Sequence, residues 1–240
     1  MRPHAERIVL VGCGGIGSWL LAPLLRFVNA ELYVGEIHLW DGDRYAERNA
    51  QRQEFAFERL GANKAQVQAE CFQTHYPALR LYAHPEYVTD RSVADAVRER
   101  TIVLVAVDNH PARHRIALQA GRLRDVCVLS AGNERLDGNV HVTLRRGGQD
   151  RTMPLLTRHP EVAQIQAGDR AEAGCEDLIE QGETQLLVTN FMAAAGLLAA
   201  FHALWTYGER HGRRKNSVVP QELYFDAGAC AMALVPAAPR

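Results

Sequence analysis

Residues 8–17, IVLVGCGGIG, combine an apolar run with a glycine-rich turn. The aliphatic residues from Ile8 to Val11 suit a strand that is buried on both faces, as in the interior of a parallel sheet. The glycines that follow permit a tight turn in which the backbone approaches a phosphate, and the next helix directs its free N–H groups at that anion. The stretch therefore predicts a nucleotide-binding strand, turn and helix, with the helix expected over residues 18–27 despite Pro23.

A second apolar run, residues 36–40, ends at Asp41, which lies 24 residues beyond Gly17. An acidic residue at this position commonly accepts hydrogen bonds from ribose hydroxyls. The turn and this aspartate accommodate either NAD or ATP, so both nucleotides stay open at this point.

Strands and helices alternate through the first half of the chain, which is typical of a parallel sheet with right-handed crossovers. The expected helices span residues 63–74, 90–100 and 113–123, and the expected strands span residues 81–88, 101–107 and 126–131. Pro85 makes the strand at 81–88 an edge or interrupted strand, because proline donates no hydrogen bond to a neighbouring strand.

The pattern changes in the second half of the chain. Residues 138–144 alternate in polarity, which indicates an antiparallel strand with one exposed face. Residues 145–183 hold several glycines and prolines with little periodicity, so we expect an irregular and functional crossover loop. Two closing strands are expected at residues 223–226 and 232–235.

No linker divides the chain, and we therefore expect one domain over residues 1–240. Its fold class is predicted to be α/β, with a Rossmann-like, mostly parallel sheet that is extended by antiparallel strands and has helices on both faces.

Residues 186–207 carry no formal charge over 22 positions, which is long enough to cross a bilayer. The segment nevertheless contains Thr189, Asn190 and His202 and is rich in alanine and glycine. We therefore expect a core or subunit-interface helix and no membrane association.

Composition excludes some classes of function. Hydrophobic residues make up 47% of the chain, charged residues 23%, and the net charge is −1. This balance favours neither a nucleic-acid binder nor a polybasic membrane anchor. The five cysteines are widely spaced, and no signal peptide is evident before the first strand, so we expect a reduced, cytoplasmic protein.

Three charged residues favour ATP over NAD. Arg52 offers a planar donor fork and Lys64 a compact charge, and both suit a triphosphate whose departing pyrophosphate gains negative charge. Asp108 follows the strand at 101–107 and is placed to hold Mg²⁺ through carboxylate oxygens. Since ligands of open α/β sheets bind beyond the carboxyl ends of the strands, we expect Gly14, Asp41 and Asp108 to converge there.

An ordered series of motifs resembles the ThiF/MoeB/ubiquitin-activating superfamily, and within it the ThiF-type members of the bacterial PRTRC gene system. The match covers roughly residues 7–140. The motifs are GxGGxG at Gly12, Gly14, Gly15 and Gly17; DxD at Asp41 and Asp43; NxxRQ at Asn49, Arg52 and Gln53; a lysine at Lys64; and DN at Asp108 and Asn109.

The resemblance implies ATP-dependent adenylation of the C-terminal carboxylate of a small ubiquitin-like or sulfur-carrier protein. It assigns the ribose to Asp41, the phosphates to Asn49, Arg52 and Lys64, and Mg²⁺ to Asp108. It also implies a homodimer and a conjugating-enzyme-like acceptor. The family's nucleotide-binding arginine before the first strand is assigned to neither Arg2 nor Arg7.

A thiol is expected to capture the activated acyl group as a thioester, because this divides one difficult transfer into easier steps. Cys175 is the candidate nucleophile, since it lies in the crossover loop shortly before the long helix, followed by Gln185 and Asn190 as in the resembling proteins. Its neighbours Glu176 and Asp177 oppose thiolate formation. Cys230 is the weaker candidate, and the lack of a CxxC pair predicts no structural zinc.

Two rival functions stay open. An NAD-dependent oxidoreductase explains the residues from Gly12 to Asp41 but gives Arg52, Lys64 and Asp108 no joint task. A nucleotide-binding scaffold that holds the small protein without activating it explains all of these residues without catalysis.

Overall fold

Strand β1 (Arg7–Val11) lies in the interior of a nine-stranded sheet. The computed structural model describes residues 5–33, 35–50, 53–54, 57–164, 187–207 and 219–238. All five residues of β1 are buried, because its apolar side chains alternate between two helical layers. Ile8 and Leu10 face one layer, whereas Val9 and Val11 face the other.

The sheet has a parallel half and an antiparallel half, in the order β3-β2-β1-β4-β5-β6-β8-β9. The parallel strands are β2 (Glu36–Trp40), β3 (Arg80–His84), β4 (Thr101–Val105) and β5 (Val126–Asn133) together with β1. The antiparallel strands are β6 (Asp137–Arg146), β8 (Pro220–Asp226) and β9 (Ala231–Pro236), and β7 (Gln149–Asp150) pairs with β6.

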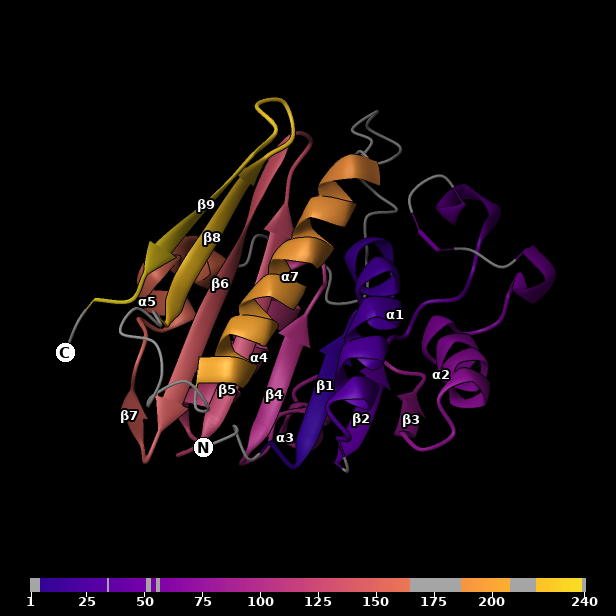
Figure 1. Ribbon diagram of the computed structural model, residues 1–240, viewed down its shortest axis with the longest axis horizontal. Coiled ribbons are helices and arrows are strands. Elements are labelled where there is room, and N and C mark those ends of the chain that lie inside the picture. Colours follow the sequence, from indigo (N-terminus) through magenta and orange to yellow (C-terminus); the bar gives the residue numbers. More distant parts are fainter. Residues whose placement is uncertain are drawn as a thin grey trace.

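Helices cover both faces of this sheet, as Figure 1 shows. The front face carries α1 (Gly15–Ala30), α2 (Lys64–His75) and α7 (Leu187–Tyr207). The rear face carries α3 (Val93–Ala96), α4 (His110–Gly121) and α5 (Leu155–Arg158). Short 3₁₀ turns occur at η1 (Glu47–Asn49), η2 (Phe57–Arg59) and η3 (Pro160–Ala163). The predicted fold class is confirmed.

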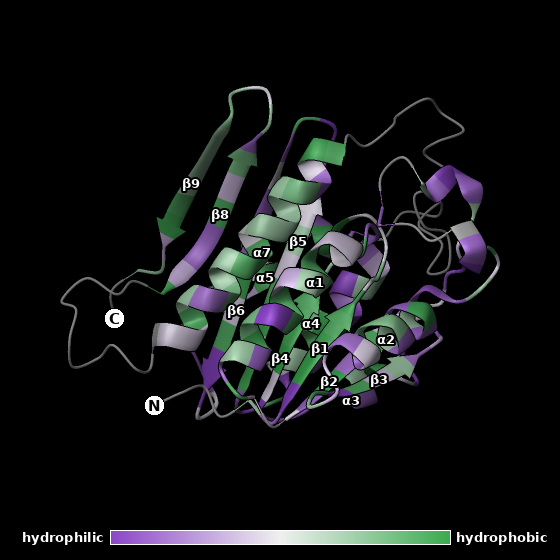
Figure 2. Ribbon diagram, turned by 45° about the vertical axis from the view of Figure 1, so that its right-hand side comes forward, coloured by the Kyte–Doolittle hydropathy of each residue, from purple (hydrophilic) through white to green (hydrophobic). Residues whose placement is uncertain are grey.

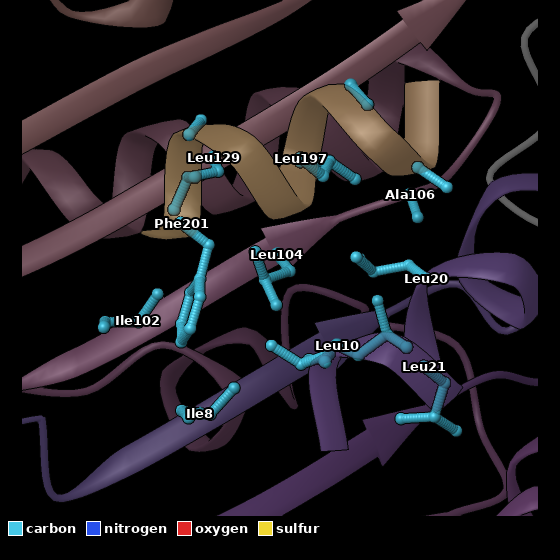
Figure 3. Packing of buried hydrophobic residues seen from close by; sticks show 14 of the residues in the cluster. Ile8, Leu10, Leu20, Leu21, Ile102, Leu104, Ala106, Leu129, Leu197 and Phe201 are labelled. Carbon is cyan, nitrogen blue, oxygen red and sulfur yellow. The ribbon is translucent and has the colours of Figure 1, made fainter. Parts of the chain in front are cut away.

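Helix α7 packs beside α1 on the front of the sheet. By length and composition alone, this helix could cross a membrane. Half of its most apolar stretch, however, is buried within the fold. Figure 2 shows α7 coloured mostly hydrophobic, with some hydrophilic turns. Figure 3 shows Leu197 and Phe201 of α7 pointing toward Leu104 and Leu129 of the sheet. The prediction of a core helix is confirmed for this inward side.

The described structure corrects several predicted boundaries. The expected helix at 90–100 shrinks to α3, because Arg100 adopts a left-handed φ of 59° and its backbone bonds to Glu6 and Asp125 draw the chain to the sheet edge. The expected helix at 113–123 begins at His110 instead, since the Asn109 side chain accepts a hydrogen bond from Ala112 N at 2.9 Å.

Other differences follow from turn residues. The expected helix at 18–27 starts earlier, at Gly15, directly inside the glycine turn, and it accommodates Pro23 without ending. The expected strand at 81–88 ends at His84, before Pro85, and β3 is an edge strand as predicted. The first part of the expected irregular stretch 145–183 holds β7, α5 and η3, and residues 165–186 lie outside the described residues.

Candidate nucleotide and carboxylate site

The glycine turn between β1 and α1 has no room for side chains at two positions. Gly12 has a φ of 93°, and a Cβ there would lie 2.7 Å from the carbonyl oxygen of Ala106. A Cβ on Gly17 would lie 1.8 Å from the carbonyl oxygen of Gly12. Only glycine therefore lets the turn pack against the exit of β4. Helix α1 starts at Gly15 without a side-chain cap, so its first N–H groups suit an anion.

Asp41 supports this turn from the end of β2. One carboxylate oxygen accepts a hydrogen bond from Cys13 N at 2.6 Å, and the other accepts one from Asp43 N at 2.7 Å. Burial raises the pKa of Asp41 to about 6, with Lys64 opposing and Asp43 adding to the rise. The carboxylate thus holds the backbone of the turn in place. Its role toward a ribose stays a prediction.

Lys64 is the first residue of α2 and is almost fully buried. Its Nζ donates to Asp43 Oδ2 at 2.9 Å and lies 4.0 Å from the position that a Cβ on Gly14 would occupy. The Tyr87 hydroxyl donates to the other Asp43 oxygen. A buried ammonium therefore abuts the glycine turn, where it can neutralise a phosphate.

Asn63 fixes the start of α2. Its side-chain oxygen accepts from Gln66 N at 3.1 Å, which caps the helix. Its amide nitrogen donates to the carbonyl oxygens of Asp41 at 2.7 Å and Asp43 at 3.0 Å. The same side chain thus joins the DxD segment to the helix that carries Lys64. Our sequence analysis did not single it out, although its place directly before Lys64 is a typical N-cap signal.

The NxxRQ segment lies on the other side of the turn. Asn49 is buried, and its side-chain oxygen accepts from Ala46 N at 3.0 Å. Gln53 Nε2 lies 3.5 Å from the Cβ position of Gly14, and its Oε1 has no hydrogen-bond partner among the described residues. Arg52 lies outside the described residues. The structure therefore brings both Gln53 and Lys64 close to Gly14.

The first turn of α7 also reaches the glycine turn. Thr189 and Asn190 are fully buried, and Asn133 Nδ2 donates to Asn190 Oδ1 at 2.9 Å and to Thr189 Oγ1 at 3.2 Å. A Cβ on Gly15 would lie 2.8 Å from Asn190 Nδ2. The helix that follows the crossover thus packs directly on the start of α1.

Asp108 lies just beyond β4 and borders a pocket of about 710 Å³. The pocket runs from the carboxyl edge of the parallel strands over the rear face of β6, β8 and β9. The polar residues of the alternating β6 sequence, Asp137, Asn139 and His141, lie on this face opposite Asp226, Tyr224 and Glu222. The sequence predicted the alternation, but the polar face lines a pocket rather than open solvent.

A buried network forms the base of this pocket. The Glu222 carboxylate is inaccessible to solvent and accepts hydrogen bonds from Asn139 Nδ2 at 2.6 Å, the Tyr224 hydroxyl at 2.7 Å and Arg158 Nε at 3.1 Å. His159 Nε2 lies 2.6 Å from the same carboxylate. Burial alone would raise the pKa of Glu222, yet these hydrogen bonds outweigh burial and lower it.

The predicted cysteines, Gln185 and Arg7 lie in different parts of the chain. Cys175 and Gln185 lie outside the described residues. Cys230 is exposed in the turn between β8 and β9. Burial raises the pKa of Cys13 well above its ordinary value, so that thiol is unsuited to nucleophilic attack. Arg7 donates to Asp95 O and is bonded to His38, at the amino end of β1 and away from the turn.

Within the described ranges, no three His, Cys, Asp or Glu side chains gather closely enough to hold a metal ion. The role of Asp108 toward Mg²⁺ stays a prediction.

Two curated relatives match parts of the chain. The sulfur carrier protein adenylyltransferase of Thermus thermophilus is 31% identical over 136 residues, which cover 56% of this chain and 48% of that protein. The adenylyltransferase and sulfurtransferase MOCS3 of Mus musculus is 30% identical over 155 residues, which cover 62% of this chain and 31% of that protein. The chain thus spans less than half the length of either relative.

The fold also matches solved structures. A crystal structure of E. coli MccB with ATP superposes with a TM-score of 0.65 at 18% identity, covering 98% of this chain and 64% of that one. The sequence model of the ThiF family matches residues 3–228. A match over nearly the whole chain, on the fold and glycine turn described above, shows that this protein belongs to the ThiF family.

Proposed function

We propose that the protein uses ATP to adenylate the C-terminal carboxylate of a small ubiquitin-like or sulfur-carrier protein. The observation that carries this proposal is the buried Lys64 ammonium, held by Asp43 against the glycine turn at the start of α1. Two curated relatives are named as adenylyltransferases, and a structural neighbour was solved with ATP, which supports the same chemistry.

The residues present fit a triphosphate. A glycine-rich turn, the uncapped start of α1 and a buried cation all favour phosphate oxygens. In the proposed complex Lys64, Arg52 and Asn49 contact the phosphates, and the DxD segment lies toward the ribose. Asp108 would hold Mg²⁺, which when bound would neutralise charge on the departing pyrophosphate.

The proposed reaction is a displacement at the α-phosphorus. A carboxylate oxygen of the partner protein attacks this phosphorus, the bond to the bridging oxygen of pyrophosphate breaks, and an acyl adenylate forms. Lys64 and Arg52 stabilise the negative charge that grows on pyrophosphate. Asp108 borders the pocket and follows β4, which pairs with β1, so we propose that the partner's chain end approaches the nucleotide through this pocket.

A thioester step would follow at Cys175. Its thiolate attacks the acyl carbon, AMP leaves with the former carboxylate oxygen, and the acyl group then passes to a conjugating-enzyme-like or sulfur-transfer acceptor. We also propose that the protein works as a homodimer in the cytoplasm, where ATP is available and thiols stay reduced.

The test is ATP–pyrophosphate exchange with small proteins encoded beside this gene. We expect Lys64→Ala to lower exchange by roughly two to three orders of magnitude, because it removes a preorganised charge, and Lys64→Arg to restore part of it. The control is Arg59→Ala, which removes a half-exposed cation that pairs with the surface residue Glu70. Wild-type exchange in Lys64→Ala would remove the phosphate assignment.

The same assay separates the thioester step. Cys175→Ala should keep pyrophosphate exchange but lose a protein–protein adduct that reducing agents cleave, whereas Cys230→Ala should keep both. Persistence of the adduct in Cys175→Ala would assign the thiol elsewhere. Binding of the small protein without any exchange would instead support the scaffold function.

A further inference from the structure

The pocket beside Asp108 has a strongly acidic entrance. Three exposed carboxylates line it where β5, β6 and β8 meet the carboxyl edge of the sheet, and we call these residues the acidic rim: Glu134, Asp137 and Asp226. Asp137 and Asp226 stand directly opposite each other on antiparallel strands. Facing residues of this kind point to the same side of a sheet, and like charges there repel. The rim therefore carries an electrostatic cost that a cation would relieve.

Most positive charges near the pocket are engaged elsewhere, whereas Arg135 is exposed in the hairpin between Glu134 and Asp137 and offsets only part of the negative charge of the rim. Arg113 Nη2 donates to the carbonyl oxygens of Val107 at 2.6 Å and Ala131 at 2.8 Å. Arg158 pairs with Glu222, and His159 lies between Glu222 and Glu161. Among the described residues, no Lys, Arg or His forms an ion pair with a member of the acidic rim. The negative charge inside the pocket is thus balanced by neighbouring cations. The surplus negative charge lies at the acidic rim, at the entrance of the pocket.

A buried polar group also borders the pocket. His141 is only 1% exposed, and its Nδ1 has no hydrogen-bond partner in the part of the chain that the structure describes. Burial lowers the pKa of His141 to about 4, so the ring is neutral near pH 7. A neutral imidazole nitrogen without a partner suits a polar ligand group such as a peptide amide.

The spacing of the carboxylates favours an extended ligand over a metal ion. They come from a hairpin and from the end of another strand, and no three acidic or histidine side chains of the described residues gather around one point. A peptide segment with a long cationic side chain can reach such spread charges while the chain end continues toward Asp108.

We propose that the acidic rim selects partner proteins whose C-terminal tail carries lysine or arginine a few residues before the terminal carboxylate. This inference rests on the proposed function, since it specifies the substrate of the same site. The tail must bring a carboxylate toward a triphosphate past three further carboxylates. A cationic side chain offsets that repulsion and draws the tail into the pocket.

The test compares two labelled peptides by fluorescence anisotropy with the full-length protein and a non-hydrolysable ATP analogue. One peptide is Ala-Leu-Lys-Leu-Lys-Gly-Gly and the other is Ala-Leu-Glu-Leu-Glu-Gly-Gly, each with a free C-terminus. We expect the lysine peptide to bind about tenfold more tightly at low salt, as for a few exposed ion pairs, and this preference to shrink as salt rises.

Variants assign the preference to the rim. Asp137→Asn/Asp226→Asn should reduce the preference to about twofold while leaving the melting temperature unchanged or higher, because it removes a repulsive pair. Asp137→Lys/Asp226→Lys should reverse it. The control Glu70→Gln/Asp95→Asn removes two carboxylates of α2 and α3 that are each 63% exposed, and it should keep the wild-type preference.

Several outcomes overturn the proposal. These are equal binding of the two peptides, no binding of either, or a preference that survives in both rim variants. If pyrophosphate exchange proceeds in any of these cases, the rim assignment fails while the proposed function stands. If the preference depends on the rim but no partner protein supports exchange, the proposed function fails while the rim still selects a basic tail.

Discussion

Asp41 has a structural role that its motif does not reveal. The sequence placed it after a strand, where an acidic residue commonly contacts a ribose. In the structure both carboxylate oxygens accept backbone N–H bonds, one from the glycine turn and one from its own DxD segment. This bracing role could not be predicted, because it depends on how closely Cys13 approaches the end of β2 in the folded protein.

The raised pKa of Asp41 gives a testable pH dependence. Its folded-state pKa of about 6 lies above the ordinary 3.8, so the folded protein binds this proton more tightly than the unfolded chain. The resulting stability is fully present below about pH 4 and is lost as the pH rises through about 6. Asp41→Asn lacks this proton, so from about pH 4 to about pH 7.5 its unfolding free energy should gain about 3 kcal/mol relative to wild type.

Urea unfolding at a series of pH values measures this difference. Asp95→Asn, whose carboxylate is 63% exposed, serves as the control and should follow wild type with little change across the range. A constant difference between Asp41→Asn and wild type, or one of opposite sign, would show that burial does not raise this pKa.

At the scale of elements, α2 is positioned by its cap. Asn63 caps the helix and also donates to the carbonyl oxygens of Asp41 and Asp43, so the start of α2 cannot move independently of the DxD segment. Since Lys64 is the next residue, the cap also fixes the ammonium beside Gly14.

Removing this cap should therefore affect both stability and nucleotide affinity. We expect Asn63→Ala to lower the unfolding free energy by about 1 to 2 kcal/mol and to raise the KM for ATP severalfold. Asn63→Asp retains the cap acceptor but places a carboxylate oxygen against the two carbonyl oxygens that the amide bonds, so it should recover neither the stability nor the affinity. Chemical denaturation and exchange kinetics provide the two measurements. An unchanged KM in Asn63→Ala would show that Lys64 is positioned without the cap.

Local signals predicted elements well and their ends less well. Runs rich in apolar residues placed β1, β2, β4 and β5, because burial on both faces favours apolar residues at most positions. The length of α3 could not be predicted in this way. It is limited by the backbone bonds of Arg100 to Glu6 and Asp125, which are distant in sequence from the helix pattern itself.

Across the whole molecule, an apolar surface extends from α7 to the edge strand β9. Phe191 and Met232 are each 44% exposed and Leu234 is 51% exposed, and Met232 Cε lies 3.9 Å from the Cβ position of Gly196 in α7. Figure 2 shows β9 coloured hydrophobic, with β8 between it and α7. Large exposed apolar side chains on two elements favour a protein partner, so we propose that a second copy covers this surface.

Sedimentation velocity tests the proposed homodimer. Met232→Asp places a charge in this surface and should shift the protein from dimer to monomer, because burial of an unpaired carboxylate is costly. The matched control is Leu60→Asp, since Leu60 is also 44% exposed but lies just before α2. A monomeric wild-type protein, or a Met232→Asp variant that remains dimeric, would contradict the proposal.

The candidate site was predicted in part, and the reason is geometric. The glycine turn, Asp41, Lys64 and Asp108 follow strands in order, so sequence alone brings them to one edge of the sheet. The pocket could not be predicted, because its floor pairs Asn139 of β6 with Tyr224 of β8, and no local pattern links these segments.

That pairing has a consequence for how the protein is made. Glu222, which completes the base of the pocket, follows its partner Asn139 by 83 residues. At ribosomal speeds of roughly 5 to 20 residues per second, β6 would wait several seconds as an open strand edge before β8 is synthesised. An open edge invites pairing with other chains. The nascent chain would therefore depend on fast folding of its parallel half, or on chaperones, until the last strands are synthesised.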